Sequence, residues 1–241
     1  MTVTATPVPI LRDNYAWLLK DSETGATAIV DPADAAPIIA AIEQAGGRLD
    51  LILLTHHHAD HTAGVDEVRA RFAAPVVGAS ADAYRLPKLD RGVKEGDTVA
   101  LGKASARVIE TPGHTVGQIN FFFPEGDILL SGDTLFSLGC GRLIEGTAQQ
   151  MYDSLAKLAA LPADTKLCCG HEYTESNGRF ALSVDGANPA LLARMDQARA
   201  QRAAGQPTVP SVLGEELQAN PFLNAGDVAT FADRRAKKDK F

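Results

Sequence analysis

Short apolar runs, each bounded by glycine, proline or aspartate, recur along the first two thirds of the chain, and this pattern predicts strands. The expected strands are residues 15–20, 27–30, 49–54, 75–77, 106–109, 119–123, 127–130 and 167–169. Amphipathic stretches predict helices at residues 37–45, 62–72 and 149–161. This alternation predicts an α/β fold with a mixed sheet.

The pattern changes beyond about Tyr173, where we expect no further strand. Residues 189–204 and 227–238 have helical periodicity, and a stretch that contains proline and glycine separates them. The sequence therefore predicts a first domain at residues 1–172 and a small α-helical subdomain at residues 173–241.

Composition and charge narrow the class of protein. The 241 residues carry a formal net charge of -7, so the overall field repels polyanions and gives no support for nucleic-acid binding. Residues 1–10 have no basic residue ahead of an apolar run, and no apolar run has transmembrane length. We therefore expect neither secretion nor a membrane association.

The three cysteines also bear on the setting of the protein. Their number is odd, and Cys168 and Cys169 are adjacent, so that an ordinary disulfide between them would be strained. Buried strand residues are the simplest interpretation of this pair, because a free cysteine commonly behaves as a small hydrophobic residue. The cysteine pattern favours a reducing, cytoplasmic environment.

The most informative segment runs from Leu51 to His61, where an apolar strand ends in four histidines and an aspartate. On an extended turn His56 and His58 point to the same side, whereas Asp60 and His61 lie around the bend at which a helix begins. One short loop could therefore supply ligands to two metal ions.

Two other residues of this loop are expected to play a supporting part. The side chain of His57 should point away from those of His56 and His58, which favours a supporting or packing role over metal ligation. Thr55, which directly precedes the histidines, is also expected to support the ligands rather than to bind metal.

The same arrangement recurs three more times, at His114, Asp133 and His171. Each follows an apolar run with a glycine between, which lets the backbone turn sharply. An isolated histidine after a strand is usually a surface or core residue, but five of six histidines at such positions are poorly explained by chance. Because functional groups collect at strand ends in α/β sheets, we predict a shared metal site.

The type and number of these ligands predict a catalytic site with two metal ions. Structural zinc sites are usually closed and rich in cysteine, whereas histidine and aspartate ligands with room for water are typical of catalytic sites. Five histidines and two aspartates are too many for one tetrahedral ion. We expect two divalent ions, with zinc the first choice, because imidazole and carboxylate suit zinc but also iron and manganese.

The histidine-rich loop resembles the signature of a known family. The segment from Thr55 to His61 resembles the THxHxDH signature of the metallo-β-lactamase superfamily, which implies an αββα sandwich. The implied ligands are His56, His58 and His114 for one ion and Asp60, His61 and His171 for the other, with Asp133 bridging the two.

Three further segments, residues 10–19, 132–146 and 169–173, resemble the glyoxalase II family within that superfamily. The resemblance implies that glutathione is contacted by Arg142, Tyr173, Arg235 and Lys238, although a solvated basic tail is an alternative for the last two. Ile144 departs from the family, some of whose members have a tyrosine there that contacts glutathione.

This resemblance implies a thioester hydrolase. The expected reaction is hydrolysis of an S-(2-hydroxyacyl)glutathione, such as S-D-lactoylglutathione, to glutathione and D-lactate, in methylglyoxal detoxification. A metal-bridging hydroxide would attack, with Asp60 and Asp133 as the catalytic carboxylates. The first domain would hold the metals, the helical subdomain would bind this small-molecule substrate, and the protein would act as a monomer.

Other functions fit the sequence less well. A glutathione persulfide dioxygenase of the same superfamily would share much of the motif set but use one iron. A β-lactamase is disfavoured because such enzymes are normally exported. A protein that only binds metal would need no open ligand position. Cys140 lies in a Gly-Cys-Gly turn without an assigned base, which disfavours thiol catalysis.

Overall fold

The computed structural model describes residues 3–241. Met1 and Thr2, which begin the segment searched for a secretory signal, lie outside the described residues. The chain forms two compact units, the first made of residues 1–110 and 117–132 and the second of residues 111–116 and 133–241. The chain therefore enters the second unit briefly before it returns to finish the first.

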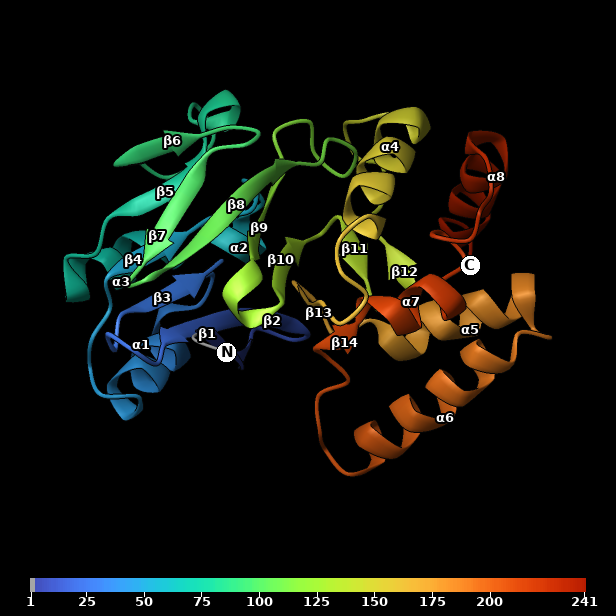
Figure 1. The fold of residues 1–241 in the computed structure, drawn as a ribbon, viewed down its shortest axis with the longest axis horizontal. Coiled ribbons are helices and arrows are strands. Elements are labelled where there is room, and N and C mark those ends of the chain that lie inside the picture. The colour runs from blue at the N-terminus through green and yellow to red at the C-terminus, as the bar shows by residue number, and fades with distance from the viewer. Residues whose placement is uncertain (1–2) are drawn as a thin grey trace. The chain divides into compact units, whose positions relative to one another are not determined.

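The first unit contains a mixed six-stranded sheet whose strands follow one another in chain order (Figure 1). Its strands are β1 (Val3–Ile10), β2 (Asn14–Asp21), β3 (Thr27–Val30), β4 (Leu51–Leu53), β5 (Val76–Ala79) and β6 (Arg91–Val93). The first three are antiparallel, whereas β3 to β6 are parallel. The parallel strands therefore end at the same edge of the sheet.

Parallel neighbours need crossover connections, and helices provide two of them. Helix α1 (Ala35–Gln44) joins β3 to β4, and α2 (Ala59–Thr62) and α3 (Val65–Phe72) join β4 to β5. Ile38 and Ile42 of α1 are buried, and α1 packs against α3, β1 and β2. The loops after β3 and β4 are thereby held at one edge of the sheet.

A second group of strands in the first unit forms an antiparallel meander. It consists of β7 (Thr98–Leu101), β8 (Ala104–Glu110), β9 (Ile119–Phe123) and β10 (Ile128–Gly132). All five residues of β9 and of β10 are buried, as expected for the inner strands of a layered fold. Because β1 contacts β10, the meander packs against the first sheet. Short 3-10 turns lie at Ser80–Asp82 and Pro124–Gly126.

The second unit is mainly helical. Its helices are α4 (Ala148–Ala159), α5 (Thr174–Asp185), α6 (Pro189–Ala203), α7 (Leu213–Ala219) and α8 (Val228–Lys238). Its strands are the hairpin β11 (Leu135–Phe136) and β12 (Gly139–Cys140), and the antiparallel pair β13 (Lys166–Cys169) and β14 (Ser211–Val212). Side chains cap three of the helices: Thr147 begins α4 in a capping box with Gln150, Asn188 caps α6, and Asp227 caps α8.

Helices α5, α6 and α7 pack on one another and enclose a small apolar core (Figure 1). Its buried members are Leu138, Ala181, Leu191, Met195 and Ala219. Leu138, which belongs to the hairpin turn, therefore ties β11 and β12 to the helices.

These elements confirm the predicted α/β class with a helical C-terminal region. The expectation that no strand follows Tyr173 is wrong, because β14 pairs with β13. Two residues are too few to give a periodic signal, and only pairing reveals such a strand. The sequence also failed to predict β1, whose Pro7 and Pro9 are tolerated because β1 is an edge strand. Within residues 3–241, no helix has both the length and the apolar character that a membrane span requires.

Candidate metal centre and substrate pocket

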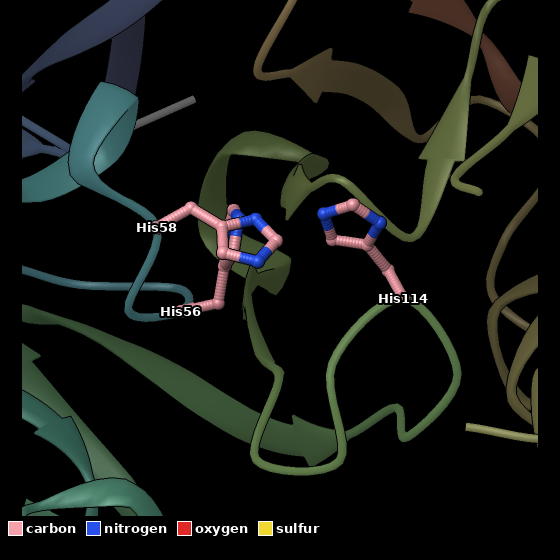
Figure 2. Close-up of side chains that lie close together, drawn as sticks. All are labelled: His56, His58 and His114. Atoms are coloured by element: carbon pink, nitrogen blue, oxygen red, sulfur yellow. The ribbon is translucent and has the colours of Figure 1, made fainter. Parts of the chain in front are cut away.

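The loop after β4 places His56 and His58 side by side, as the sequence predicts. The Nε2 atom of His56 lies 3.1 Å from the Nδ1 atom of His58. Figure 2 shows these two imidazoles, together with His114 of the second unit. His56 is fully buried, whereas His58 is half-buried. Two imidazole nitrogens this close, one of them on a fully buried ring, form a site that can accept a cation.

Asp31, directly after β3, organises this loop from beneath. Its Oδ1 atom accepts a hydrogen bond from the Thr55 backbone N–H at 2.8 Å, and its Oδ2 atom accepts one from the Thr55 hydroxyl at 2.6 Å. The Nδ1 atom of His61 lies 3.0 Å from the same Oδ2. A carboxylate at Nδ1 fixes the tautomer, so the Nε2 atom of His61 is left as an electron-pair donor. The predicted supporting role of Thr55 fits these contacts.

Asp60 lies in the single turn of α2, and its side chain is 45% exposed. Asn14, the first residue of β2, donates hydrogen bonds to the Asp60 carbonyl at 3.0 Å and to its Oδ2 atom at 3.1 Å. The Nε2 atom of His61 lies 3.8 Å from the same Oδ2. Asn14 therefore orients a carboxylate that remains accessible to solvent.

His57 points to a different partner, as the sequence predicts. Its Nδ1 atom lies 3.0 Å from the Oδ2 atom of Asp82, which is 1% exposed. Arg85 donates to the other oxygen of Asp82 at 2.7 Å. These contacts support a positioning role for His57.

The second unit brings together the three other expected ligands. The Oδ2 atom of Asp133 lies 3.5 Å from the Nε2 atom of His114 and 3.3 Å from the Nε2 atom of His171. All three residues are buried. Asp133 directly follows β10, His114 lies in the loop after β8, and His171 follows β13, so the strand-end prediction holds for each of them.

The hydrogen bonds around His114 show that this donor set fits a metal ion. Its Nδ1 atom lies 2.8 Å from the Arg142 carbonyl oxygen. Because a carbonyl oxygen only accepts hydrogen bonds, Nδ1 carries the hydrogen and donates this one. In a neutral ring the Nε2 atom then carries a lone pair that faces a carboxylate oxygen of Asp133. Two electron-pair donors in this arrangement repel each other unless a cation neutralises them, and imidazole with carboxylate suits zinc and iron.

A cavity of about 360 Å³ opens beside these ligands within the second unit. His114 and Asp133 line it, and so do the four residues expected to bind substrate, Arg142, Tyr173, Arg235 and Lys238. The remaining lining residues are Phe136, Cys140, Ile144, Ser176 and Asn177. A metal-capable pair of side chains and three cationic side chains thus face one cavity.

The three cations differ in how they are held. Arg142 is 67% exposed, and its Nε atom lies 3.5 Å from Asp239. Arg235 is buried, donates to the Cys140 carbonyl at 2.8 Å and pairs with Asp239 at 2.9 Å. The Lys238 ammonium donates to the Ser176 carbonyl at 3.1 Å. Burial, reinforced by the positive charge of Arg235, lowers the pKa of Lys238 to about 8.

Comparisons with known proteins agree with this geometry. Residues 10–171 match the model of the metallo-beta-lactamase superfamily, and residues 172–241 match that of the hydroxyacylglutathione hydrolase C-terminus. The hydroxyacylglutathione hydrolase of Acidiphilium cryptum is 56% identical over 239 residues, which cover 99% of this chain and 97% of that one. That of Rhodobacter capsulatus is 48% identical, with 100% of each chain covered. The chain belongs to the hydroxyacylglutathione hydrolase family.

Solved structures support the fold of this family member. The structure of ETHE1 from Myxococcus xanthus superimposes with a TM-score of 0.68 at 26% identity, covering 95% of this chain and 90% of that one. The BLEG-1 B3 metallo-beta-lactamase gives a TM-score of 0.69 at 23% identity, covering 92% and 99%. A structure of TTHA1623 in a di-iron-bound form gives 0.66 at 26% identity, covering 90% and 100%. The predicted metallo-β-lactamase fold is confirmed.

Tyr173 and Ile144 also line the pocket of this hydroxyacylglutathione hydrolase family member, and neither side chain is charged. The Tyr173 ring stacks on His171 with a centroid distance of 4.5 Å and an angle of 9°. The Ile144 side chain is exposed. Tyr173 therefore joins the predicted ligand His171 to the cavity wall, whereas Ile144 offers the cavity only an apolar surface.

The Cys140 thiol also lines the pocket, but its environment disfavours a nucleophilic role. Burial raises its pKa to about 11, although the nearby charge of Arg235 opposes this effect. The thiol is therefore protonated at neutral pH, when a nucleophile must be a thiolate. Among the residues that the structure describes, the three cysteines form no disulfide.

Sequence reasoning missed several residues that organise this site. Asp31 could have been found, because it follows a strand as the predicted ligands do. Asn14 belongs to the recognised segment 10–19 and Asp82 to none, but the sequence did not show which group either residue contacts. Phe136 was part of a recognised segment, yet nothing in the sequence showed that its ring contacts His171 and Tyr173.

Proposed function

We propose that this protein hydrolyses the thioester of S-(2-hydroxyacyl)glutathione, such as S-D-lactoylglutathione, to glutathione and a 2-hydroxy acid. One observation carries the proposal: His114 and Asp133 line the same cavity as Arg142, Arg235 and Lys238. Glutathione is anionic, and a local basic pocket is what an acidic protein needs in order to bind it. Membership of the hydroxyacylglutathione hydrolase family supports the same reaction.

The metal ligands follow from the motif and the family. We propose His56, His58 and His114 for one divalent ion, Asp60, His61 and His171 for the other, and Asp133 as the shared ligand. Zinc is the first choice, with iron and manganese as alternatives. When bound, such ions make hydroxide available near neutral pH and polarise a carbonyl oxygen.

The side chains divide the remaining work. Asp60, which Asn14 orients, accepts a hydrogen bond from the attacking water. Arg142, Arg235 and Lys238 attract the carboxylates of glutathione, and the Tyr173 hydroxyl contacts its peptide part. The leaving thiolate has a parent thiol pKa of about 8.5, so it departs without a dedicated general acid.

Further aspects of the proposal follow from the same interpretation. Residues 1–172 would form the metal-binding domain and residues 173–241 the substrate-binding subdomain. We propose that the protein acts in methylglyoxal detoxification in the cytoplasm, as a monomer. Size-exclusion chromatography with light scattering checks the last point, since a dimer would elute at twice the mass of the chain.

The deciding experiment measures hydrolysis of S-D-lactoylglutathione by the loss of thioester absorbance, with metal content determined on the same sample. We expect rapid turnover with about two metal ions per chain. If the thioester is stable, one iron is present and oxygen is consumed with glutathione persulfide, the protein is instead a persulfide dioxygenase.

A further inference from the structure

The hairpin of β11 and β12 begins two residues after Asp133 and carries Phe136 and Cys140 into the wall of the substrate pocket. Its turn contains Leu138 with a φ of 57°, in the left-handed region that a leucine seldom adopts. A turn of this kind persists only where the surrounding structure holds it. The contacts that hold the hairpin therefore shape the pocket.

Side chains of the C-terminal helices satisfy the backbone of this hairpin almost residue by residue. Asn220, directly after α7, donates from one amide nitrogen to the carbonyls of Phe136 at 3.1 Å and Gly139 at 3.0 Å. Glu216 of α7 accepts a hydrogen bond from the Leu138 N–H at 2.7 Å. The end of α7 and the residue that follows it thus bind both strands of the hairpin and its turn.

Side chains of three other helices, α5, α6 and α8, also hold the hairpin. Asn177 of α5 donates to the Ser137 carbonyl at 3.1 Å, and Arg235 of α8 donates to the Cys140 carbonyl at 2.8 Å. Arg194 of α6 donates to the Ser137 hydroxyl at 3.2 Å. Because buried polar groups are costly to leave unmatched, these contacts leave the hairpin little freedom.

Glu216 lies at the centre of these contacts. It is 1% exposed, and the amide nitrogen of Asn220 also lies 3.3 Å from its Oε2 atom. Burial raises the pKa of Glu216, whereas the hydrogen bond from Leu138 and the charge of Arg194 oppose that rise.

The hairpin in turn touches the reacting site through Phe136. The Phe136 ring meets the ring of His171 edge-on at a centroid distance of 5.9 Å and that of Tyr173 at 5.5 Å. A shift of the hairpin would therefore move a pocket wall, a proposed metal ligand and a proposed substrate contact together.

We propose that Glu216 and Asn220 are positioning residues that fix the β11 and β12 hairpin and thereby set the shape of the glutathione pocket. The inference rests on the proposed function for its substrate. Neither residue lines the cavity, so each acts through Phe136 and Cys140. The C-terminal helices then serve catalysis in two ways, by direct contact through Arg235 and Lys238 and by holding the hairpin.

The test compares Glu216→Ala and Asn220→Ala with the conservative Glu216→Gln, which keeps an acceptor for the Leu138 N–H. The control is Glu215→Ala, which removes an exposed carboxylate from the same helix. We expect hydrogen exchange in residues 135–140 to accelerate at least about tenfold in both disruptive variants, as loss of one buried hydrogen bond predicts. Exchange in α4 should be unchanged, and Glu216→Gln should restore most of the protection.

With S-D-lactoylglutathione, the disruptive variants should raise KM about tenfold with a smaller loss of kcat. Wild-type KM and hairpin exchange in a folded Glu216→Ala or Asn220→Ala variant would refute the proposal, as would an equal effect of Glu215→Ala. If Glu216→Ala does not fold, Asn220→Ala is compared with Asn220→Ser instead, because serine keeps one hydrogen-bond donor. Wild-type protein that leaves the thioester intact refutes the proposed function alone, because the exchange measurement needs no turnover.

Discussion

At the scale of single residues, two imidazole rings of the candidate site are oriented by a contact at Nδ1, the ring nitrogen that faces away from the site. Asp31 holds the far nitrogen of His61, and the Arg142 carbonyl holds that of His114. In both rings the Nε2 atom is left to face a carboxylate, of Asp60 or of Asp133. Rings held in this way would present a lone pair to a metal ion, which binds imidazole only in its neutral form.

The substitution Asp133→Ala tests the shared ligand. We expect metal content to fall from about two ions per chain and turnover to fall with it, because in the proposed arrangement this one carboxylate would serve both ions. Metal analysis and thioester hydrolysis on the same preparation measure both effects. Full activity in a variant that retains both metals would contradict the two-metal proposal.

Lys238 should give the enzyme a pH dependence in substrate binding. Its lowered pKa of about 8 means that the ammonium loses its proton as the pH rises through that value. The pocket then loses one positive charge, so kcat/KM should decrease above about pH 8. In Lys238→Arg the decrease should vanish, since a guanidinium stays protonated. An unchanged profile in that variant would assign the pH dependence to another group.

Ile144 allows a gain of function. A tyrosine at this exposed pocket position could donate one hydrogen bond to glutathione, which contributes about 0.5 to 1.5 kcal/mol. We therefore expect Ile144→Tyr to lower KM about two- to tenfold with kcat unchanged. Ile144→Phe is the matched control, because it adds the ring without the hydroxyl, and an equal gain there would show that packing alone is responsible.

At the scale of elements, most of the proposed metal ligands follow strand ends, and helix α8 carries two of the proposed substrate contacts. The parallel arrangement of β3 and β4 brings Asp31 and His56 to one edge of the sheet. Helix α8 places Arg235 and Lys238 three residues apart, and therefore on one face of the helix. Each of these elements therefore places its functional groups on one side.

Ending the chain at Arg234 should separate substrate binding from chemistry. Arg235 and Lys238 line the pocket but are not among the proposed metal ligands. KM should therefore increase more than kcat decreases. Thermal denaturation of the truncated protein controls for loss of the α8 packing. Equal losses in kcat and kcat/KM would place these residues in the chemical step instead.

At the scale of the whole molecule, metal binding and stability are linked. Ions that bind only the folded chain stabilise it by about 2.7 kcal/mol when their concentration is 100 times the dissociation constant. Removal of metal with a chelator should therefore lower Tm by several degrees, and added zinc should restore it. A variant without the shared ligand, Asp133→Ala, should show a smaller shift, and an equal shift would indicate binding elsewhere.

The sequence by itself determined the α/β class, the helical C-terminal region and the family. It did so because the hydrophobic pattern is local and because metal ligands recur directly after apolar runs, where a reader of the sequence can find them. The roles proposed for the individual ligands and substrate contacts stay predictions, and so does the domain boundary at residue 172.

Only the tertiary structure decided which groups hold the ligands and the pocket in place. Asn14 and Asp60 are 46 positions apart, Asn220 and Phe136 are 84 apart, and Arg235 and Cys140 are 95 apart. The two-residue strand β14 exists only because β13 pairs with it. Such contacts have no local signature, since a hydrogen bond between distant residues depends on where the folded chain returns and not on the pattern around either partner.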